Sequence, residues 1–164
     1  MNILTAVNSR LSRWAMYIAC VCLAGLVLIV DYAVVMRYVF NDAPPFVEQV
    51  ALLLVISVSM FGASAGVRDA GHIGLDSLVS KLPKGAQSVC ALLVGVITIT
   101  FAVFLFACGI VMAQETIDHT IPTLGISEAY RFLPPVIAGV LMLLFSLEHI
   151  VAIFTKKKVV PSWH

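Results

Sequence analysis

Four long apolar stretches constrain this chain more than any other feature of its sequence. The stretches are Ala15–Met36, Val50–Val67, Gly85–Gln114 and Phe132–Thr155. The second and third contain no charged residue, the first holds only Asp31, and the fourth holds only Glu148 and His149. A helix needs about 20 mostly apolar residues to cross about 30 Å of hydrocarbon. Because backbone groups in lipid must be paired within the segment, each stretch is predicted to form a transmembrane helix.

The composition excludes the soluble alternatives. Hydrophobic residues make up 61% of the 164 residues and charged residues only 12%, whereas soluble domains are about 45–50% apolar. So few charges cannot cover a soluble enzyme, a disordered tail or a secreted disulfide module, and a net charge of +1 gives no footprint for nucleic acid. We predict an all-α integral membrane protein, one membrane domain over residues 1–164, with spans at 15–37, 46–67, 87–114 and 132–155.

Lysine and arginine residues near the ends of the spans predict the orientation of the chain. Eight of the ten lie on one side, namely Arg10, Arg13, Arg68, Lys81, Lys84 and Lys156–Lys158. Only Arg37 and Arg131 lie on the other side, which predicts that both termini are in the cytoplasm. A cleaved signal peptide is the alternative for the first stretch, but this stretch is long for one and no A-x-A-like cleavage site follows it.

The inner connection carries a helical pattern of its own. Between Leu75 and Leu82, apolar residues recur at the i, i+3, i+4 and i+7 spacing of one helix face. We predict a short amphipathic interfacial helix over about residues 72–82, between the second and third spans, at the cytoplasmic membrane surface. His72 and Asp76 are interpreted as a latch that fixes this helix, with Arg68 before them, or as an ordinary solvated polar face.

Two further features are candidate contact surfaces. Gly62 and Gly66 form a G-x-x-x-G pair in the second span, a pattern that lets helix backbones approach closely in lipid. This strip docks either inside the four-helix bundle or on a partner subunit, and we slightly favour the bundle. The outer connections form an acidic rim that would steer a basic partner, with ordinary loop charge as the alternative. The candidate periplasmic docking residues are Asp42, Asp118, His119 and Glu128.

Three short motifs occur in order along the chain. They are Arg37-Tyr38-Val39-Phe40-Asn41 followed by Pro45 and Glu48, then Gly71-His72-Ile73-Gly74-Leu75-Asp76 followed by Leu82-Pro83, then Thr123-Leu124-Gly125-Ile126 followed by Tyr130 and Pro134. With the four spans, they resemble the small membrane subunit of tripartite ATP-independent periplasmic (TRAP) transporters over residues 10 to 155. The chain departs from that pattern at Phe46, where the family often has tryptophan, and at Gln49, which replaces the second residue of an acidic pair.

The resemblance implies a transport complex in a bacterial inner membrane. A large multi-span subunit would carry the substrate and ion sites, and a soluble periplasmic binding protein would deliver an organic acid, typically a dicarboxylate or sialic acid. Sodium entry would drive this symport, and the small subunit would anchor the large one as a scaffold. The residues assigned to partner-subunit contacts or structural roles are Arg37, Asn41, Pro45, Glu48, Gly62, Gly66, Arg68, His72 and Asp76.

The chemistry of the charged residues also favours a scaffold. A self-sufficient transporter needs ionisable groups near mid-membrane. Asp31 lies toward the outer surface, where we expect it to reach water or pair with a cation such as Arg131, with ion coupling as the alternative. Glu148 and His149 are interpreted as inner-interface groups, with partner contact as the second reading.

We expect no enzymatic activity, no catalytic, metal-binding or substrate-binding residue, and no cofactor. The expected partners are the two other transporter components and membrane lipids, without nucleic acid. One alternative function is a small autonomous four-helix exporter acting as a dimer, although dual-topology versions need a more balanced charge distribution. The other is a membrane-embedded enzyme or cytochrome, for which the spans offer no polar constellation.

Overall fold

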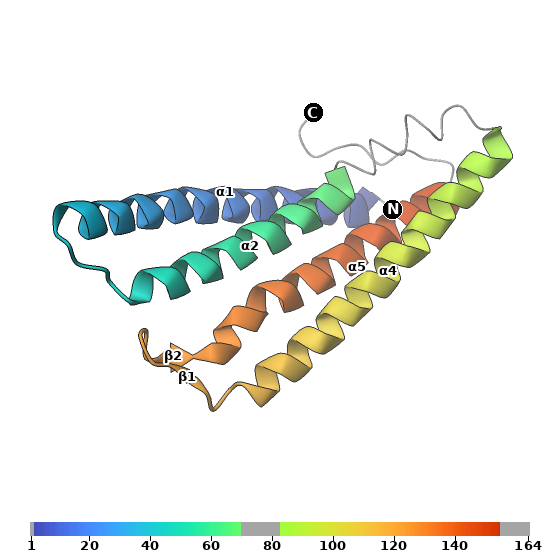
Figure 1. The fold of residues 1–164 in the computed structure, drawn as a ribbon. Coiled ribbons are helices and arrows are strands. Elements are labelled where there is room, and N and C mark those ends of the chain that lie inside the picture. Colours follow the sequence, from blue (N-terminus) through green and yellow to red (C-terminus); the bar gives the residue numbers. More distant parts are fainter. Residues whose placement is uncertain (1, 70–82, 155–164) are drawn as a thin grey trace.

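The computed structural model describes residues 2–69 and 83–154. In chain order, its elements are α1 (Asn2–Val39), α2 (Phe46–Asp69), α4 (Lys84–Glu115), β1 (Thr120–Ile121), β2 (Ile126–Ser127), η1 (Glu128–Phe132) and α5 (Leu133–Phe154). Four of the helices are long and apolar enough to cross a membrane, which confirms the predicted all-α, four-span class (Figure 1). The predicted interfacial helix over 72–82, with His72 and Asp76, lies outside the described residues.

Local sequence sets where the helices begin. The pair Pro44-Pro45 precedes α2, and Pro134-Pro135 lies in the first turn of α5, where a missing N–H leaves no helical hydrogen bond unmade. Glu48 lies in the first turn of α2, where its carboxylate suits the helix dipole. With 38 residues, α1 is about 57 Å long at 1.5 Å per residue. It is therefore much longer than the thickness of the hydrocarbon layer.

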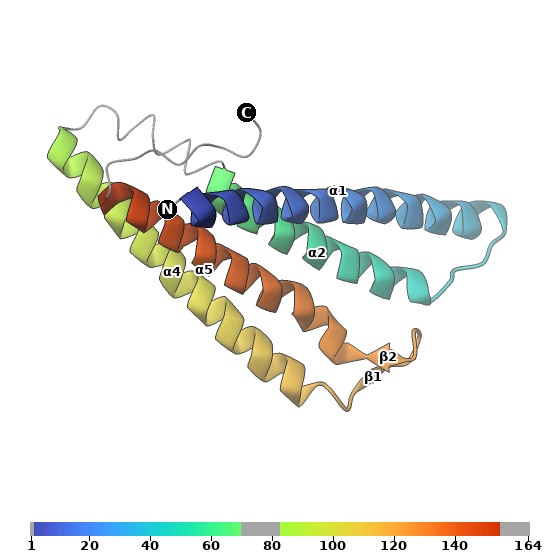
Figure 2. The same cartoon turned by 180° about the vertical axis from the view of Figure 1, so that it is seen from behind.

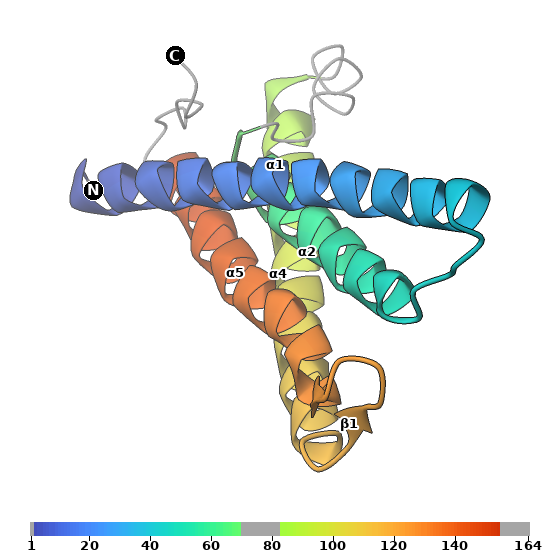
Figure 3. The ribbon, with the colours of Figure 1, turned by 90° about the vertical axis from the view of Figure 1, so that its left-hand side faces the viewer.

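The helices form an open array. α2 packs between α1 and α5, and α4 packs on α5, so that α1 and α4 lie on the two outer sides (Figures 1 and 2). The helices fan out from the end that carries the N-terminus (Figures 1 and 2), and a side view shows that α1 crosses α5 steeply (Figure 3). Because the array is open, many large apolar side chains of α1 and α4 remain exposed for lipid or protein partners.

Small residues bring neighbouring helices together. Ala15 and Ala19 of α1 pack with Phe61 and Ala65 of α2 in the buried apolar cluster. Between α4 and α5 the approach is closer, because a Cβ atom on Gly139 would lie 3.1 Å from the carbonyl oxygen of Ala102. Helices in lipid gain little from the hydrophobic effect, so such close backbone packing supplies much of their association.

The two outer connections differ in form. The first contains Asn41 in a left-handed backbone conformation with φ of 53°, which asparagine tolerates better than most residues. The second is larger and includes an antiparallel pair in which Thr120 opposes Ser127 and Ile121 opposes Ile126. Gly125 takes a φ of 66° in the turn between the two strands.

Candidate functional site

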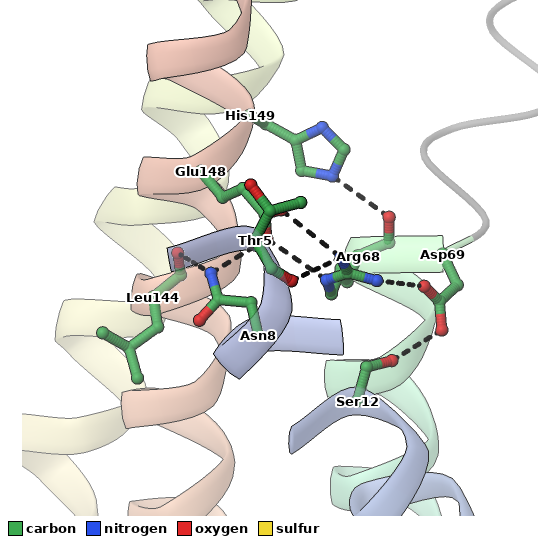
Figure 4. A network of polar contacts seen from close by, with 8 residues as sticks. All are labelled: Thr5, Asn8, Ser12, Arg68, Asp69, Leu144, Glu148 and His149. Carbon is green, nitrogen blue, oxygen red and sulfur yellow. Dashed lines mark hydrogen bonds and ion pairs between the residues drawn. The ribbon is translucent and has the colours of Figure 1, made fainter. Parts of the chain in front are cut away.

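A buried polar cluster occupies the place where α1, α2 and α5 meet (Figure 4). We call it the Arg68 cluster, and its members are Thr5, Asn8, Ser12, Arg68, Asp69, Leu144, Glu148 and His149. Arg68 is the penultimate residue of α2, and its side chain is 0% exposed. A guanidinium with no access to solvent is costly unless its donors are used. The groups that accept hydrogen bonds from Arg68 therefore determine whether its burial is favourable.

Two carboxylates share the guanidinium of Arg68. Its Nε lies 3.1 Å from Oε2 of Glu148, and its Nη2 lies 3.3 Å from Oε1 of the same carboxylate. Its Nη1 lies 2.9 Å from Oδ1 of Asp69. The Arg68–Glu148 pair is bidentate and joins α2 to α5, and the planar fork of arginine suits this geometry. A lysine at position 68 would not reproduce it.

Helix α1 closes the cluster from the other side. Asn8 Nδ2 donates to Glu148 Oε2 at 2.9 Å and to the Leu144 carbonyl oxygen at 3.2 Å. Ser12 Oγ donates to Asp69 Oδ2 at 2.6 Å. Asn8 and Ser12 are four residues apart, so they lie on the same face of α1, and both are buried. One polar face of α1 thus binds both acidic residues.

His149 extends the cluster to the end of α2. Its Nε2 lies 3.2 Å from the backbone carbonyl oxygen of Arg68. A carbonyl oxygen only accepts, so in this contact Nε2 carries the proton and donates. The last four carbonyl groups of a helix lack intrahelical partners, and His149 therefore satisfies one of these groups on α2. The histidine of α5 caps the neighbouring helix.

The Arg68 cluster is internally satisfied. Within residues 2–69 and 83–154, the buried side-chain nitrogen or oxygen atoms without a hydrogen-bond partner are Arg131 Nε and Ser146 Oγ, neither of which belongs to it. Removing one member of a buried ion pair typically costs about 3–5 kcal/mol, because the remaining charge stays buried and uncompensated. The site is therefore a structural network of ion pairs and hydrogen bonds that joins three helices.

The sequence identified only part of this site. The sequence predicts a structural or partner role for Arg68 beside His72 and Asp76. In the structure its side chain points into the helix array and pairs with Glu148. Glu148, interpreted as an interface group, is buried at 4% exposure. Asn8, Ser12 and Asp69 were not singled out. The available signal was the i, i+4 pair of small polar residues on an apolar helix.

The slight preference for docking the G-x-x-x-G strip inside the bundle is wrong. An added Cβ atom on Gly62 or Gly66 would meet nothing within 4 Å among the described residues. The face of α2 that packs on its neighbours instead carries Phe61, Ala65 and Arg68. At about 100° of rotation per residue, the centre of this face lies about 110° around the helix from the glycine strip. The strip is therefore open toward lipid or a partner.

The outer end of the array has its own arginine contacts. Arg131 Nη1 lies 2.8 Å from Oε1 of Glu128, and its Nη2 donates to Oε1 of Gln49 at 2.8 Å. This links η1 to the start of α2. Asp31 is expected either to reach water or to pair with a cation such as Arg131. Its side chain is exposed, which agrees with the first arrangement, and Arg131 binds Glu128 and Gln49 instead. Gln49, which replaces the second residue of the acidic pair, has a defined role as the acceptor of Arg131.

The remaining predicted contact residues lie at the surface of the chain. All are exposed except Glu128, whose carboxylate is shared with Arg131. The exposed residues are Arg37, Asn41, Asp42, Pro45, Glu48, Asp118 and His119. The acidic rim therefore keeps Asp42 and Asp118 as exposed carboxylates, while the charge of Glu128 is compensated by its neighbour.

The four long apolar helices and the buried polar network between them define a multi-pass helical membrane protein. The sequence profile of the family described as "Tripartite ATP-independent periplasmic transporters, DctQ component" matches residues 26–156. The chain therefore belongs to this family, the small permease subunits of TRAP transporters. Its place is a bacterial inner membrane, where it is a component of a transporter.

Three relatives show the same affiliation. Two TRAP transporter small permease proteins of Haemophilus influenzae are 24% and 21% identical, over 78% and 76% of this chain and 80% and 75% of their own lengths. The sialic acid TRAP transporter small permease protein SiaQ of Vibrio cholerae is 23% identical over 78% of this chain and 74% of its own length. Each relative is thus matched over most of its length.

Proposed function

We propose that this chain is the scaffold subunit of a sodium-driven secondary transporter. It anchors a large multi-span subunit in the bilayer, and that subunit carries the substrate and ion sites. The observation that carries the proposal is the Arg68 cluster, in which Arg68 and Asp69 of α2 and Glu148 of α5 bind one another rather than lining a path. A subunit whose helices are joined in this way is suited to stay rigid while its partner changes conformation.

Three hydroxyl groups within α2 and α4 support the same role. Ser57, Thr98 and Thr100 each donate to the carbonyl oxygen four residues earlier in their own helix, at 2.8–2.9 Å. Such back-bonding satisfies a hydroxyl inside a helix without any outside partner. These polar side chains of α2 and α4 are therefore engaged within their helices. A route for an organic acid would need donors that point away from the helix.

The outer surface is the proposed contact with the periplasmic binding protein. Asp42 in the first outer connection and Asp118 and His119 in the second are exposed. The backbone N–H of Glu128 donates to the carbonyl oxygen of His119 at 2.8 Å. Exposed carboxylates steer a partner that carries basic patches, and this attraction weakens as salt is added. Arg37, Asn41, Pro45 and Glu48 are proposed to contact the large subunit or to shape this end. His72 and Asp76 remain proposed as a latch near the opposite surface.

The substrate is proposed to be an organic acid of the dicarboxylate or sialic acid class. The relative named for sialic acid, at 23% identity, is the observation that favours this class. In this scheme the binding protein selects the acid, and the small subunit does not touch it. Family membership does not favour the alternative of an autonomous exporter, because the relatives are named as permease subunits.

Reconstituted uptake tests this proposal. Proteoliposomes that contain the large subunit, the binding protein and this chain are expected to take up labelled sialic acid or a dicarboxylate when sodium is higher outside. Omitting this chain is expected to abolish uptake, and replacing the sodium gradient with potassium is expected to do the same. Full uptake without this chain would contradict the scaffold role, and uptake that ignores sodium would contradict the proposed coupling.

A further inference from the structure

The outer side of α1 carries a compact group of basic and aromatic side chains. Its members are Arg10, Arg13, Trp14 and Tyr17, which we call the basic–aromatic face. Their spacing of i, i+3, i+4 and i+7 places them on one side of the helix. All four are exposed, with Trp14 at 66% and Tyr17 at 54%. The two rings contact each other edge to face at 6.4 Å between centroids.

This face points away from the other helices. The buried residues of the same part of α1 are Asn8, Ser12, Ala15 and Ala19, which pack toward α2 and α5. At about 100° of rotation per residue, the centre of the buried set lies about 180° from the centre of the basic–aromatic face. Figures 1 and 2 show α1 at the edge of the array. Packing of α1 on the other described helices therefore leaves Arg10, Arg13 and Trp14 exposed.

The described residues do not compensate the positive charge on this face. Within residues 2–69 and 83–154, the ion pairs involve Arg68 and Arg131, and neither Arg10 nor Arg13 takes part in one. The first acidic residue of α1 is Asp31, about 27 Å along the helix from Arg13. Two neighbouring guanidinium groups thus share an open surface and have five donors each.

The depth of this face in the bilayer also points to a ligand. Arg13 and Arg37 bracket the apolar part of α1, and they are about 36 Å apart along the axis. A tilted helix of that length fits the hydrocarbon layer with both arginines at the level of the headgroups. Trp14 and Tyr17 then lie at the interface, which is the usual place for amphipathic rings.

We propose that the basic–aromatic face binds the phosphate headgroup of an anionic phospholipid in the predicted cytoplasmic leaflet. The arginine side chains pair with the phosphate oxygens, a geometry that their planar forks favour. The rings of Trp14 and Tyr17 pack beside the glycerol and upper acyl segments of the same lipid. The bound lipid holds the first helix at a fixed depth and tilt, independently of which solute the complex transports.

Fluorescence quenching of Trp14 tests the site. The chain contains two tryptophans, so a Trp163→Phe background leaves Trp14 as the only reporter. The full chain is placed in bilayers that contain either brominated phosphatidylglycerol or brominated phosphatidylcholine at equal mole fraction. We expect quenching by the anionic lipid to exceed quenching by the zwitterionic lipid at least about twofold, because each arginine near a membrane surface attracts anionic lipid.

Substitutions distinguish lipid binding by Arg10 and Arg13 from a general preference of the protein surface for anionic lipid. Arg10→Gln with Arg13→Gln is expected to bring the quenching ratio to about one. The matched control Arg37→Gln, an exposed arginine in the last turn of α1, is expected to leave it unchanged. Equal quenching by both lipids in the unsubstituted reporter chain would overturn the proposal. A preference that survives the double substitution would overturn it as well.

Two further experiments identify the molecule that binds the basic–aromatic face. Excess inorganic phosphate is expected to leave the ratio unchanged, and a ratio that falls to one would assign the face to free phosphate instead of lipid. The measurement is repeated on the complex with a large subunit whose tryptophans are replaced by phenylalanine, so that Trp14 stays the only reporter, and the same preference is expected. If assembly abolishes quenching by both lipids, the large subunit covers Trp14 and the lipid site is refuted.

Discussion

Replacing Arg68 with glutamine is expected to destabilise the protein strongly. The substitution removes both contacts to Glu148, at 3.1 and 3.3 Å, and the contact to Asp69 at 2.9 Å. Glu148 is 4% exposed, so its carboxylate stays buried without a cation. Breaking such a buried pair costs about 3–5 kcal/mol. For a chain of this size, each kcal/mol lowers the melting temperature by about 2–4 °C, so the expected fall is about 6–20 °C.

The assay is the loss of the monodisperse peak in size-exclusion chromatography after heating the purified protein in detergent. Arg131→Gln is the matched control, because Arg131 and Glu128 are 23% and 35% exposed. A partly exposed pair contributes about 1 kcal/mol or less, so its melting temperature should fall by at most about 4 °C.

A double substitution shows whether the pair itself is responsible. Arg68→Gln combined with Glu148→Gln removes both charges, so the double variant should lose at least about 1 kcal/mol less than the sum of the two single losses. Additive losses would indicate that the two side chains do not interact in the folded protein. If Arg68→Gln lowers the melting temperature no more than Arg131→Gln does, the stabilising role of the buried ion pair is refuted.

Four other substitutions probe contacts of the Arg68 cluster, of the helix packing and of the outer end of the array. Asn8→Ala removes a donor to Glu148 and should lower the free energy of unfolding by about 1–3 kcal/mol in the same melting assay; an unchanged melting temperature would contradict the role of α1. Gly139→Leu should prevent a monodisperse preparation, because the added Cβ atom meets the backbone of Ala102. Gly62→Leu should leave the melting temperature unchanged, because nothing described lies within 4 Å of the added Cβ atom. If Gly62→Leu were the more damaging of the two, the packing assignment would be refuted. Gln49→Glu should give Arg131 an ionic partner and raise the unfolding free energy by up to about 1 kcal/mol, most at low salt; lower stability would count against that contact.

Hydropathy was sufficient to predict the helices but not how they meet. Each span is defined by its own composition, since the hydrocarbon thickness fixes the length of an apolar helix. The Arg68 cluster depends on which helices are neighbours. Arg68 and Glu148 are 80 positions apart, and nothing local in either segment indicates that α2 packs on α5. The position of both residues at the same predicted end of their spans was the available clue.

The glycine pattern shows a second limit of sequence reasoning. A small residue permits close helix approach, but it does not say which helix approaches. Gly62 and Gly66 match the G-x-x-x-G pattern and lie open, whereas Gly109 and Gly139, on different helices, lie at the tight α4–α5 contact. The contact depends on the complementary shapes of two faces, which a single-helix motif does not record.

The central claim is that this chain transports nothing by itself and works through its partners. The most direct measurement is uptake by proteoliposomes that contain only this chain, with labelled sialic acid or a dicarboxylate outside and sodium, proton and potential gradients imposed in turn. We predict that uptake equals that of empty liposomes under every gradient. Saturable, gradient-dependent accumulation above that background would contradict the claim.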